Sequence, residues 1–175
     1  MKHITKVAFL VLALGASACT NPDRFGTGAG GEGAGTGANA NAGIVPGSAA
    51  DPTSAAYFQQ TVGDRVLFAV DQSTLSSQGR EVLSKQAAWL MDNAGFTAII
   101  EGHADEQGTR EYNLALGARR ASAVQNFLIE RGVAPNRMRT VSYGKERPIE
   151  ICSTEICYSQ NRRSVTILSA GAATS

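Results

Sequence analysis

The sequence has no apolar run long enough to cross a membrane, no excess of charge of either sign and few metal-binding side chains. The apolar stretch at residues 7–14 falls well short of the roughly 20 residues that a bilayer requires. The 16 basic residues nearly balance the 15 acidic ones, so long-range attraction to nucleic acid or anionic lipid is absent. With only two histidines and three cysteines, the chain offers little material for a metal site.

What the sequence does have is a short leader that ends in a cysteine. Lys2 and Lys6 precede the apolar residues 7–14, and small residues at 15–18 stand before Cys19. This order is typical of a secretory signal peptide. A cysteine directly after the small residues resembles a bacterial lipobox, in which the cysteine becomes the lipidated first residue. We therefore predict a signal peptide over residues 1–18 and lipidation of Cys19; the alternative is a secreted protein whose cysteine stays free.

A second cysteine pair lies near the end of the chain. Cys152 and Cys157 are separated by four residues, and in an oxidising compartment this spacing most simply predicts a local disulfide. A zinc site and free thiols are the alternatives. No second Cys/His pair lies nearby, and His103 is the only histidine outside the leader. We expect neither a metal nor a cofactor.

A glycine-rich segment separates the leader from the rest of the chain. Residues 20–56 contain nine of the 19 glycines and a single aromatic residue, Phe25. Such a stretch cannot bury enough apolar surface to offset the entropy of ordering it. As a coil of 37 residues it would reach about 35 Å. We predict a lipidated, flexible tether over residues 19–56, one folded domain over residues 57–168 and a disordered tail over residues 169–175.

The domain shows alternating strand and helix patterns. The apolar pattern predicts strands at 65–70, 96–102, 138–143 and 163–168. A first helix begins after Ser76 and can end at Gly95, with Trp89 outside its apolar stripe; a second begins near Thr109 and ends at Gly132. The predicted fold is α+β (an α/β sandwich): a β-α-β-α-β-β mixed four-stranded sheet with its helices on one face.

Opposite charges flank the start of the second helix. Asp105 follows the second strand, Arg120 lies about three turns into the helix, and the helix start near Thr109 offers unpaired N–H groups. Together these groups suit a zwitterion, whose ammonium would bind the acid and whose carboxylate would bind the arginine. The competing interpretation is a structural Asp105–Arg120 salt bridge that only ties loop to helix.

Other polar residues carry weaker signals. No serine or cysteine nucleophile has a recognisable motif around it, so we do not expect an enzyme. For His103 we expect a hydrogen bond that braces its loop. Arg162, in the run Asn161-Arg162-Arg163, could approach the same cleft, but a solvated pair or a charge at the sheet edge is favoured.

The segment from residue 102 to residue 124 carries a family resemblance. Its Gly-His-Ala-Asp start and its Leu-Gly, Arg-Ala and Val positions (Gly102–Asp105, Gly108, Tyr112–Asn113, Leu116–Gly117, Arg120–Ala121 and Val124) resemble the peptidoglycan-binding motif of OmpA-like domains. The resemblance continues through residues 141–148 and 159–163 and covers roughly residues 65–168. It implies an OmpA-like fold and a binding domain, not an enzyme.

The resemblance also implies a ligand, the diaminopimelate of the cell-wall stem peptide. Asp105 would bind its ammonium group and Arg120 its carboxylate. Leu116 and backbone groups near Ala104 would line the pocket.

Three further residues are assigned to the pocket by the resemblance. Phe68 matches the phenylalanine of the family's first strand. An aspartate often follows that phenylalanine, but here the position is Ala69, and Asp71 is the candidate to supply the second acid. Asn113 either braces the connecting loop or faces the ligand.

Together with the leader and the tether, the resemblance implies a lipid-anchored protein of a Gram-negative outer membrane that faces the periplasm and holds the peptidoglycan. The resemblance implies a TolB-like β-propeller partner that competes with the wall, and a role in envelope integrity and cell division. The alternatives are an OmpA-like envelope adaptor unconnected with the Tol system and a cell-wall-modifying enzyme.

Overall fold

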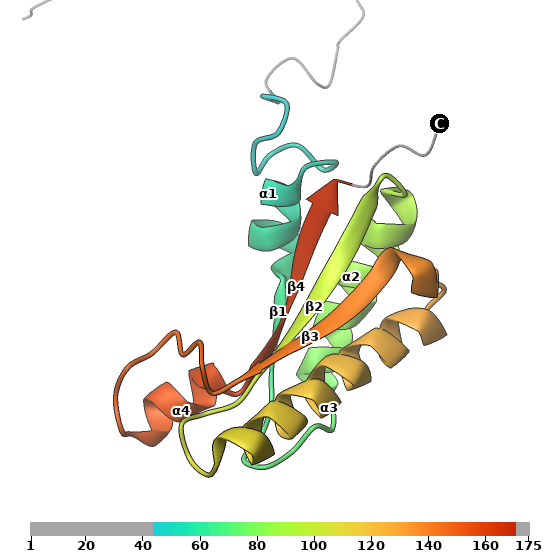
Figure 1. The fold of residues 1–175 in the computed structure, drawn as a ribbon. Helices are drawn as coiled ribbons and strands as arrows, with labels where there is room; N and C mark the ends of the chain where they lie inside the picture. The colour runs from blue at the N-terminus through green and yellow to red at the C-terminus, as the bar shows by residue number, and fades with distance from the viewer. Residues whose placement is uncertain (1–43, 171–175) are drawn as a thin grey trace, which may run out of the picture. The chain divides into compact units, whose positions relative to one another are not determined.

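The computed structural model describes residues 44–170, whose sheet has four strands in the order β1-β4-β2-β3 (Figure 1). The strands are β1 (Arg65–Leu67), β2 (Phe96–His103), β3 (Met138–Gly144) and β4 (Arg163–Ala170). β4 pairs antiparallel with both β1 and β2, and β2 pairs parallel with β3. The predicted mixed sheet is confirmed. The signal peptide, Cys19 and residues 171–175 lie outside the described residues.

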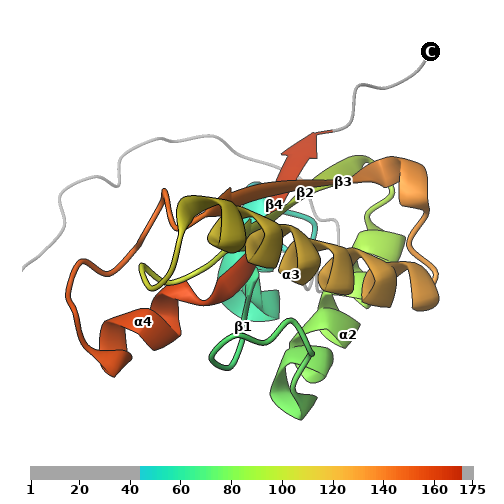
Figure 2. The same cartoon turned by 60° about the horizontal axis from the view of Figure 1, so that its bottom comes forward.

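Two long helices cover one face of this sheet (Figure 2). α2 (Ser77–Asp92) begins where the Ser76 hydroxyl accepts a hydrogen bond from the Gly79 N–H, and α3 (Arg110–Glu130) begins at the corresponding bond from Tyr112 to Thr109. Both predicted helix starts are therefore confirmed. The core between helices and sheet contains apolar side chains from both layers, among them Leu83, Leu90, Ile100, Val124 and Leu128. None of the helices within residues 44–170 is long and apolar enough to span a membrane.

Helix α3 lies directly against strand β2 at two glycines. A Cβ atom built on Gly102 would overlap the carbonyl group of Gly117, and one built on Gly117 would overlap the Gly102 backbone and the Ser142 hydroxyl. Only glycine permits such close contact between backbones. This contact fixes the distance between the end of β2 and the first half of α3, where the predicted site residues lie.

The folded part of the chain begins before residue 57. α1 (Ala55–Tyr57) is capped by Ser54 and continues into a π-helical turn at Phe58–Gly63. The Trp89 indole N–H donates to the Pro52 carbonyl over 2.7 Å, and its ring packs against Phe58 and Phe96. Trp89 is therefore part of the core, contrary to its position outside the apolar stripe. Part of the segment that the sequence assigns to the tether is packed against the domain.

A short helix that the sequence analysis did not predict, α4 (Glu155–Asn161), lies at the end of the sheet where β2 and β3 finish (Figure 1). A disulfide joins Cys152 to Cys157 and encloses the start of this helix, which confirms the predicted pairing. The strand limits also differ from those predicted. β1 ends at Leu67 instead of residue 70, and β4 continues to Ala170, into the predicted tail.

Candidate functional site

A cavity of about 310 Å³ opens where β2 ends and α3 begins. Its walls come from the loop after β1, the loop between β2 and α3, and the first two turns of α3. The lining residues are Val70, Asp71, Asp105, Gln107, Gly108, Tyr112, Asn113 and Leu116. Four of the seven predicted binding residues therefore meet in one cavity: Asp71, Asp105, Asn113 and Leu116. A second cavity, of about 220 Å³, lies between β1 and α2 and has one charged residue, Arg65, in its lining.

Asp105 is the buried acid of the larger cavity, with an exposed fraction of 8%. One carboxylate oxygen accepts a hydrogen bond from the Gln107 N–H at 3.3 Å. The other accepts from the Arg162 guanidinium at 3.1 Å. The Asp105–Arg120 salt bridge considered above is absent from the ion pairs of residues 44–170. Asp105 is held by Arg162 instead.

Arg120 lies beneath the cavity and is fully buried. Its guanidinium donates to three backbone carbonyls, those of Gln72 at 2.8 Å, His103 at 2.7 Å and Ala69 at 3.2 Å, and it lies over the Phe68 ring. Burial lowers the pKa of Arg120 to about 10, and the side chain stays charged at neutral pH. A guanidinium has five N–H donors, so these three bonds leave two unused. Arg120 therefore ties the loop after β1 to the end of β2.

The remaining predicted residues divide between lining and support. The Asn113 amide donates to the Gln107 carbonyl at 2.7 Å, which is the loop-bracing contact, and the residue also lines the cavity. Leu116 forms part of the apolar wall. Ala104 is buried, and its N–H already donates to the Gly144 carbonyl at 2.8 Å. Phe68 is buried under Arg120 and is absent from the cavity lining.

The loop after β1 carries a strained acid at the rim of the cavity. Asp71 has a φ of 54°, the only positive φ of a non-glycine residue in the described part of the chain. The Tyr112 hydroxyl donates a hydrogen bond to its carboxylate, and this bond raises the pKa of Tyr112. Such strain persists where surrounding contacts hold a residue in place, often at binding sites. The bond joins the loop to α3 across the cavity rim.

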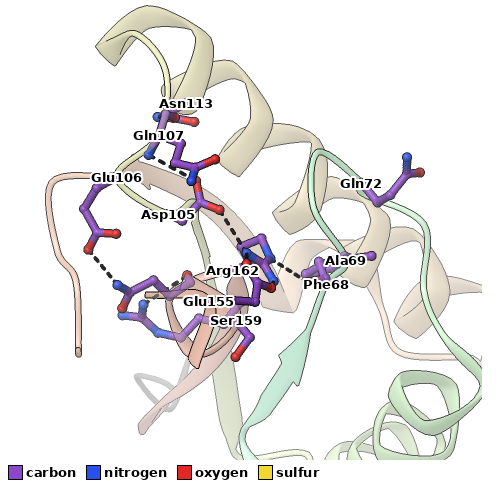
Figure 3. Close-up of polar contacts among 12 residues, drawn as sticks. Phe68, Ala69, Gln72, Asp105, Glu106, Gln107, Asn113, Glu155, Ser159 and Arg162 are labelled. Atoms are coloured by element: carbon purple, nitrogen blue, oxygen red, sulfur yellow. Dashed lines mark hydrogen bonds and ion pairs between the residues drawn. The ribbon is translucent and has the colours of Figure 1, made fainter. Parts of the chain in front are cut away.

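Arg162 is the site residue that sequence reasoning misjudged. It is buried at the junction of α4 and β4, whereas a solvated or sheet-edge charge was favoured. Figure 3 shows it between Asp105 and Phe68, whose carbonyl accepts from its Nε at 3.2 Å. It also forms a bidentate pair with Glu155. Burial opposes the charge, but the bonds to Glu155 and Asp105 raise the pKa of Arg162. The only sequence signal for this residue is the resemblance at residues 159–163.

His103 does not make the predicted bracing hydrogen bond with its side chain. Both ring nitrogens are buried without a hydrogen-bond partner, although the Glu101 carboxylate lies 3.5 Å from Nε2. The ring stacks on Tyr143. Burial, together with the nearby positive charges of Arg163, Arg147 and Arg65, lowers the pKa of His103 to about 4. No group of three acids, histidines or cysteines suited to a metal ion occurs within residues 44–170.

Comparison with known proteins gives the same class of fold as the geometry. The family model described as the OmpA family matches residues 67–162. The crystal structure of the peptidoglycan-associated lipoprotein from Burkholderia pseudomallei superposes with a TM-score of 0.63 at 34% identity, covering 68% of this chain and 100% of that one. The C-terminal domain of Helicobacter pylori MotB superposes with a TM-score of 0.58 at 22% identity, over 62% and 86% of the two chains, and shares the fold alone. The mixed sheet, with helices on one face and an acidic cavity at its strand ends, is an OmpA-like domain.

Closer relatives come from the curated proteins. The peptidoglycan-associated lipoprotein of Brucella melitensis is 55% identical over 120 residues, which cover 69% of this chain and 71% of that protein. The protein of the same name from Mesorhizobium japonicum is 50% identical over 127 residues, covering 73% and 76%. The chain belongs to the OmpA family, and these two curated relatives are named peptidoglycan-associated lipoproteins.

Proposed function

We propose that this protein is an outer-membrane lipoprotein that binds peptidoglycan without catalysis, through the cavity formed by the end of β2 and the start of α3. The proposed ligand is the diaminopimelate of the stem peptide. The observation that carries the proposal is the position of Asp105, a buried carboxylate at the wall of a cavity of about 310 Å³. The names of the relatives, which describe association with peptidoglycan, support the same ligand.

The chemistry of the cavity suits the ammonium group of the ligand. Asp71 and Asp105 both line the cavity, whereas no arginine or lysine does. Charge-assisted hydrogen bonds from an ammonium to a carboxylate are about twice as strong as neutral ones. In this proposal Asp105 takes the ammonium, and Asp71 supplies the second acid that Ala69 lacks. Leu116 contacts the aliphatic part of the ligand, and Asn113 holds the loop beside it.

The carboxylate of the ligand is assigned to Arg120. Three of its donors bind backbone carbonyls, so the carboxylate would take the two that remain. Phe68 supports the guanidinium from below, and the backbone near Ala104 forms the neighbouring wall. Arg120 therefore has two roles in the proposal, since the side chain that binds the ligand also holds the cavity together.

Anchoring and partners complete the proposal. The predicted signal peptide and the lipobox-like Cys19 support attachment to the outer membrane through lipid, as does the word lipoprotein in the relatives' names. The domain would then face the periplasm. As a member of the Tol–Pal system, the protein would also bind a TolB-like β-propeller protein in competition with the wall. The mass of the mature chain tests the anchor, because lipidation adds acyl chains at Cys19 and a Cys19→Ser variant lacks them.

The binding test compares two Asp→Asn variants of the full chain in sedimentation with purified peptidoglycan. Asp105→Asn should remain in the supernatant, because a neutral amide cannot balance the ligand ammonium. Asp92→Asn is the matched control: it makes the same charge change at an exposed position near the end of α2, and it should pellet like the parent. If Asp105→Asn also pellets like the parent, the proposed site is wrong. Turnover of muropeptides by the parent would favour an enzyme instead.

A further inference from the structure

Arg162 lies between two carboxylates that come from different parts of the chain. Its Nη1 is 3.1 Å from the Asp105 carboxylate and 3.3 Å from that of Glu155, and its Nη2 donates to the second oxygen of Glu155. Figure 3 shows Glu155 next to Arg162, on the side of α4. Asp105 and Arg162 are buried, whereas the Glu155 side chain is two-thirds exposed. The three side chains together carry one net negative charge.

Glu155 is held in this position by covalent and polar contacts. It is the first residue of α4, and the Cys152–Cys157 disulfide brackets it on both sides. At the other end of the helix, the Asn161 side chain accepts hydrogen bonds from the backbone N–H groups of residues 149 and 150 at 2.9 and 3.1 Å. Asn161 also donates to the Glu106 carboxylate at 2.7 Å. The segment that carries Glu155 is therefore held by contacts within itself and by the hydrogen bond to Glu106, the residue next to Asp105.

This arrangement has an electrostatic consequence for Asp105. If Arg162 paired with Asp105 alone, the two charges would neutralise each other and Asp105 would attract a cation weakly. Glu155 takes a donor from each terminal nitrogen of Arg162, which is the strong bidentate geometry for a carboxylate. The positive charge is then shared, and the carboxylate of Asp105 keeps negative potential toward the cavity.

We propose that Glu155 is a positioning residue for ligand recognition: it shares Arg162 with Asp105, and so leaves Asp105 the negative charge that attracts a ligand ammonium. This inference rests on the proposed function of the cavity. It assigns a binding role to α4, which contributes no residue to the cavity lining. It also gives the Cys152–Cys157 disulfide a role, because that bond restricts the segment from which Glu155 reaches Arg162.

The test measures affinity for a soluble muropeptide that contains diaminopimelate, by calorimetry on the full chain. Glu155→Gln should weaken binding about threefold, the scale expected when one partly solvated charge acts at a distance. Glu150→Gln is the matched control. It makes the same charge change in the same segment, but within residues 44–170 its carboxylate has no ion pair, so the affinity should equal that of the parent.

Two further measurements separate an electrostatic role from a structural one. With the free amine of the muropeptide acetylated, parent and Glu155→Gln should bind equally, because the group that senses the charge is gone. The Arg162 guanidinium holds the pKa of Glu155 below its usual range, so the difference between parent and variant should stay constant between about pH 5 and pH 8 and narrow at lower pH. A difference that survives acetylation would overturn the proposal.

The disulfide supplies a second variant. Cys152→Ser combined with Cys157→Ser should weaken binding by no more than Glu155→Gln does, and adding Glu155→Gln to this pair should cost less than it costs the parent. Additive losses would contradict the link between the disulfide and Glu155.

Failure of the proposed role of Glu155 is distinguishable from failure of the proposed function of the cavity. If Asp105→Asn loses binding while Glu155→Gln binds like the parent, only the role of Glu155 is wrong.

Discussion

Two buried arginines, Arg120 and Arg162, lie behind the lining of the cavity, and their hydrogen-bond partners differ in kind. On the α3 side, Arg120 donates to three backbone carbonyls and to no carboxylate among the described residues. On the α4 side, Arg162 pairs with the carboxylates of Asp105 and Glu155 and donates to one carbonyl. The first arginine therefore fixes the path of the chain, whereas the second adjusts the charge of a neighbouring acid.

This difference shows that burial and residue type do not define the role of an arginine. Carbonyl partners are neutral, so Arg120 keeps its full positive charge in the interior behind the cavity lining. Carboxylate partners are charged, so Arg162 is more than neutralised by the two acids around it. The charged residues of the cavity lining are thus the acids Asp71 and Asp105, and the positive charge of Arg120 lies behind that lining.

The largest loss of stability should come from removing Arg120, the arginine whose partners are carbonyls. Arg120→Ala would remove the guanidinium donor from the buried His103 carbonyl and from the part-buried carbonyls of Ala69 and Gln72, and would leave a cavity in place of the side chain. It should lower the free energy of unfolding by about 4 kcal/mol, measured by urea denaturation. Arg119→Ala, at the exposed neighbouring position, should change it by less than about 0.5 kcal/mol. A loss below about 1 kcal/mol at Arg120 would contradict its structural role and leave only the ligand-binding one.

A second substitution, at Asp105, should affect stability differently when Arg162 is replaced than when Arg120 is replaced. Arg162→Met would leave Asp105 buried without its cation and should lower the free energy of unfolding by about 3 kcal/mol. Adding Asp105→Asn should recover about 1 kcal/mol, because no unpaired buried charge remains. The same second change should recover nothing in Arg120→Ala. Equal recovery in both backgrounds would remove the distinction between the two arginines.

The smallest effect is a loss of stability at acidic pH, and it should come from His103 instead of from either arginine. The folded-state pKa of His103 is about 4, whereas its ordinary value is 6.5, so between these values only the unfolded chain binds the proton. The free energy of unfolding should therefore be highest above pH 6.5 and should fall by roughly 2–3 kcal/mol as the pH decreases toward 4. Both arginines stay charged throughout this window.

Urea denaturation between pH 7 and pH 4.5 measures this slope. His103→Phe keeps a ring to stack on Tyr143 and cannot titrate, so its free energy of unfolding should be nearly independent of pH in that range. A slope of the same size in the variant would mean that another group causes the acid sensitivity.

The parts of the fold that repeat a pattern could be predicted from the sequence. The apolar periodicity located α2 and α3, and the hydroxyls of Ser76 and Thr109 located their first residues. Helix α4 could not be found in this way. It has seven residues, and Ile156 on it is exposed, so no apolar stripe marks it. The turn before β1 was missed because its stability comes from contacts with Trp89, more than thirty residues away in sequence.

The candidate site was predictable where its residues are near one another in sequence. Asp105, Asn113 and Leu116 lie on one loop and the helix that follows, so their spacing places them in the same cavity. The partner of Asp105 is 57 residues away, and neither charge nor spacing distinguishes Arg162 from the other arginines. The bonding of Arg120 to carbonyls was equally hidden, because backbone acceptors leave no trace in side-chain composition.

The contact between Gly102 and Gly117 limits how this cavity could be altered. Backbone atoms, which have no rotamers to change, set the separation of strand and helix at that point, so repacking the core elsewhere cannot widen the cavity along this direction. Room for a bulkier or thinner ligand can come from the loop after β1 or from the loop between β2 and α3, which both contribute to the cavity lining. Differences in ligand selectivity among proteins of this fold should therefore come from residues in those two segments, while the strand–helix junction stays the same.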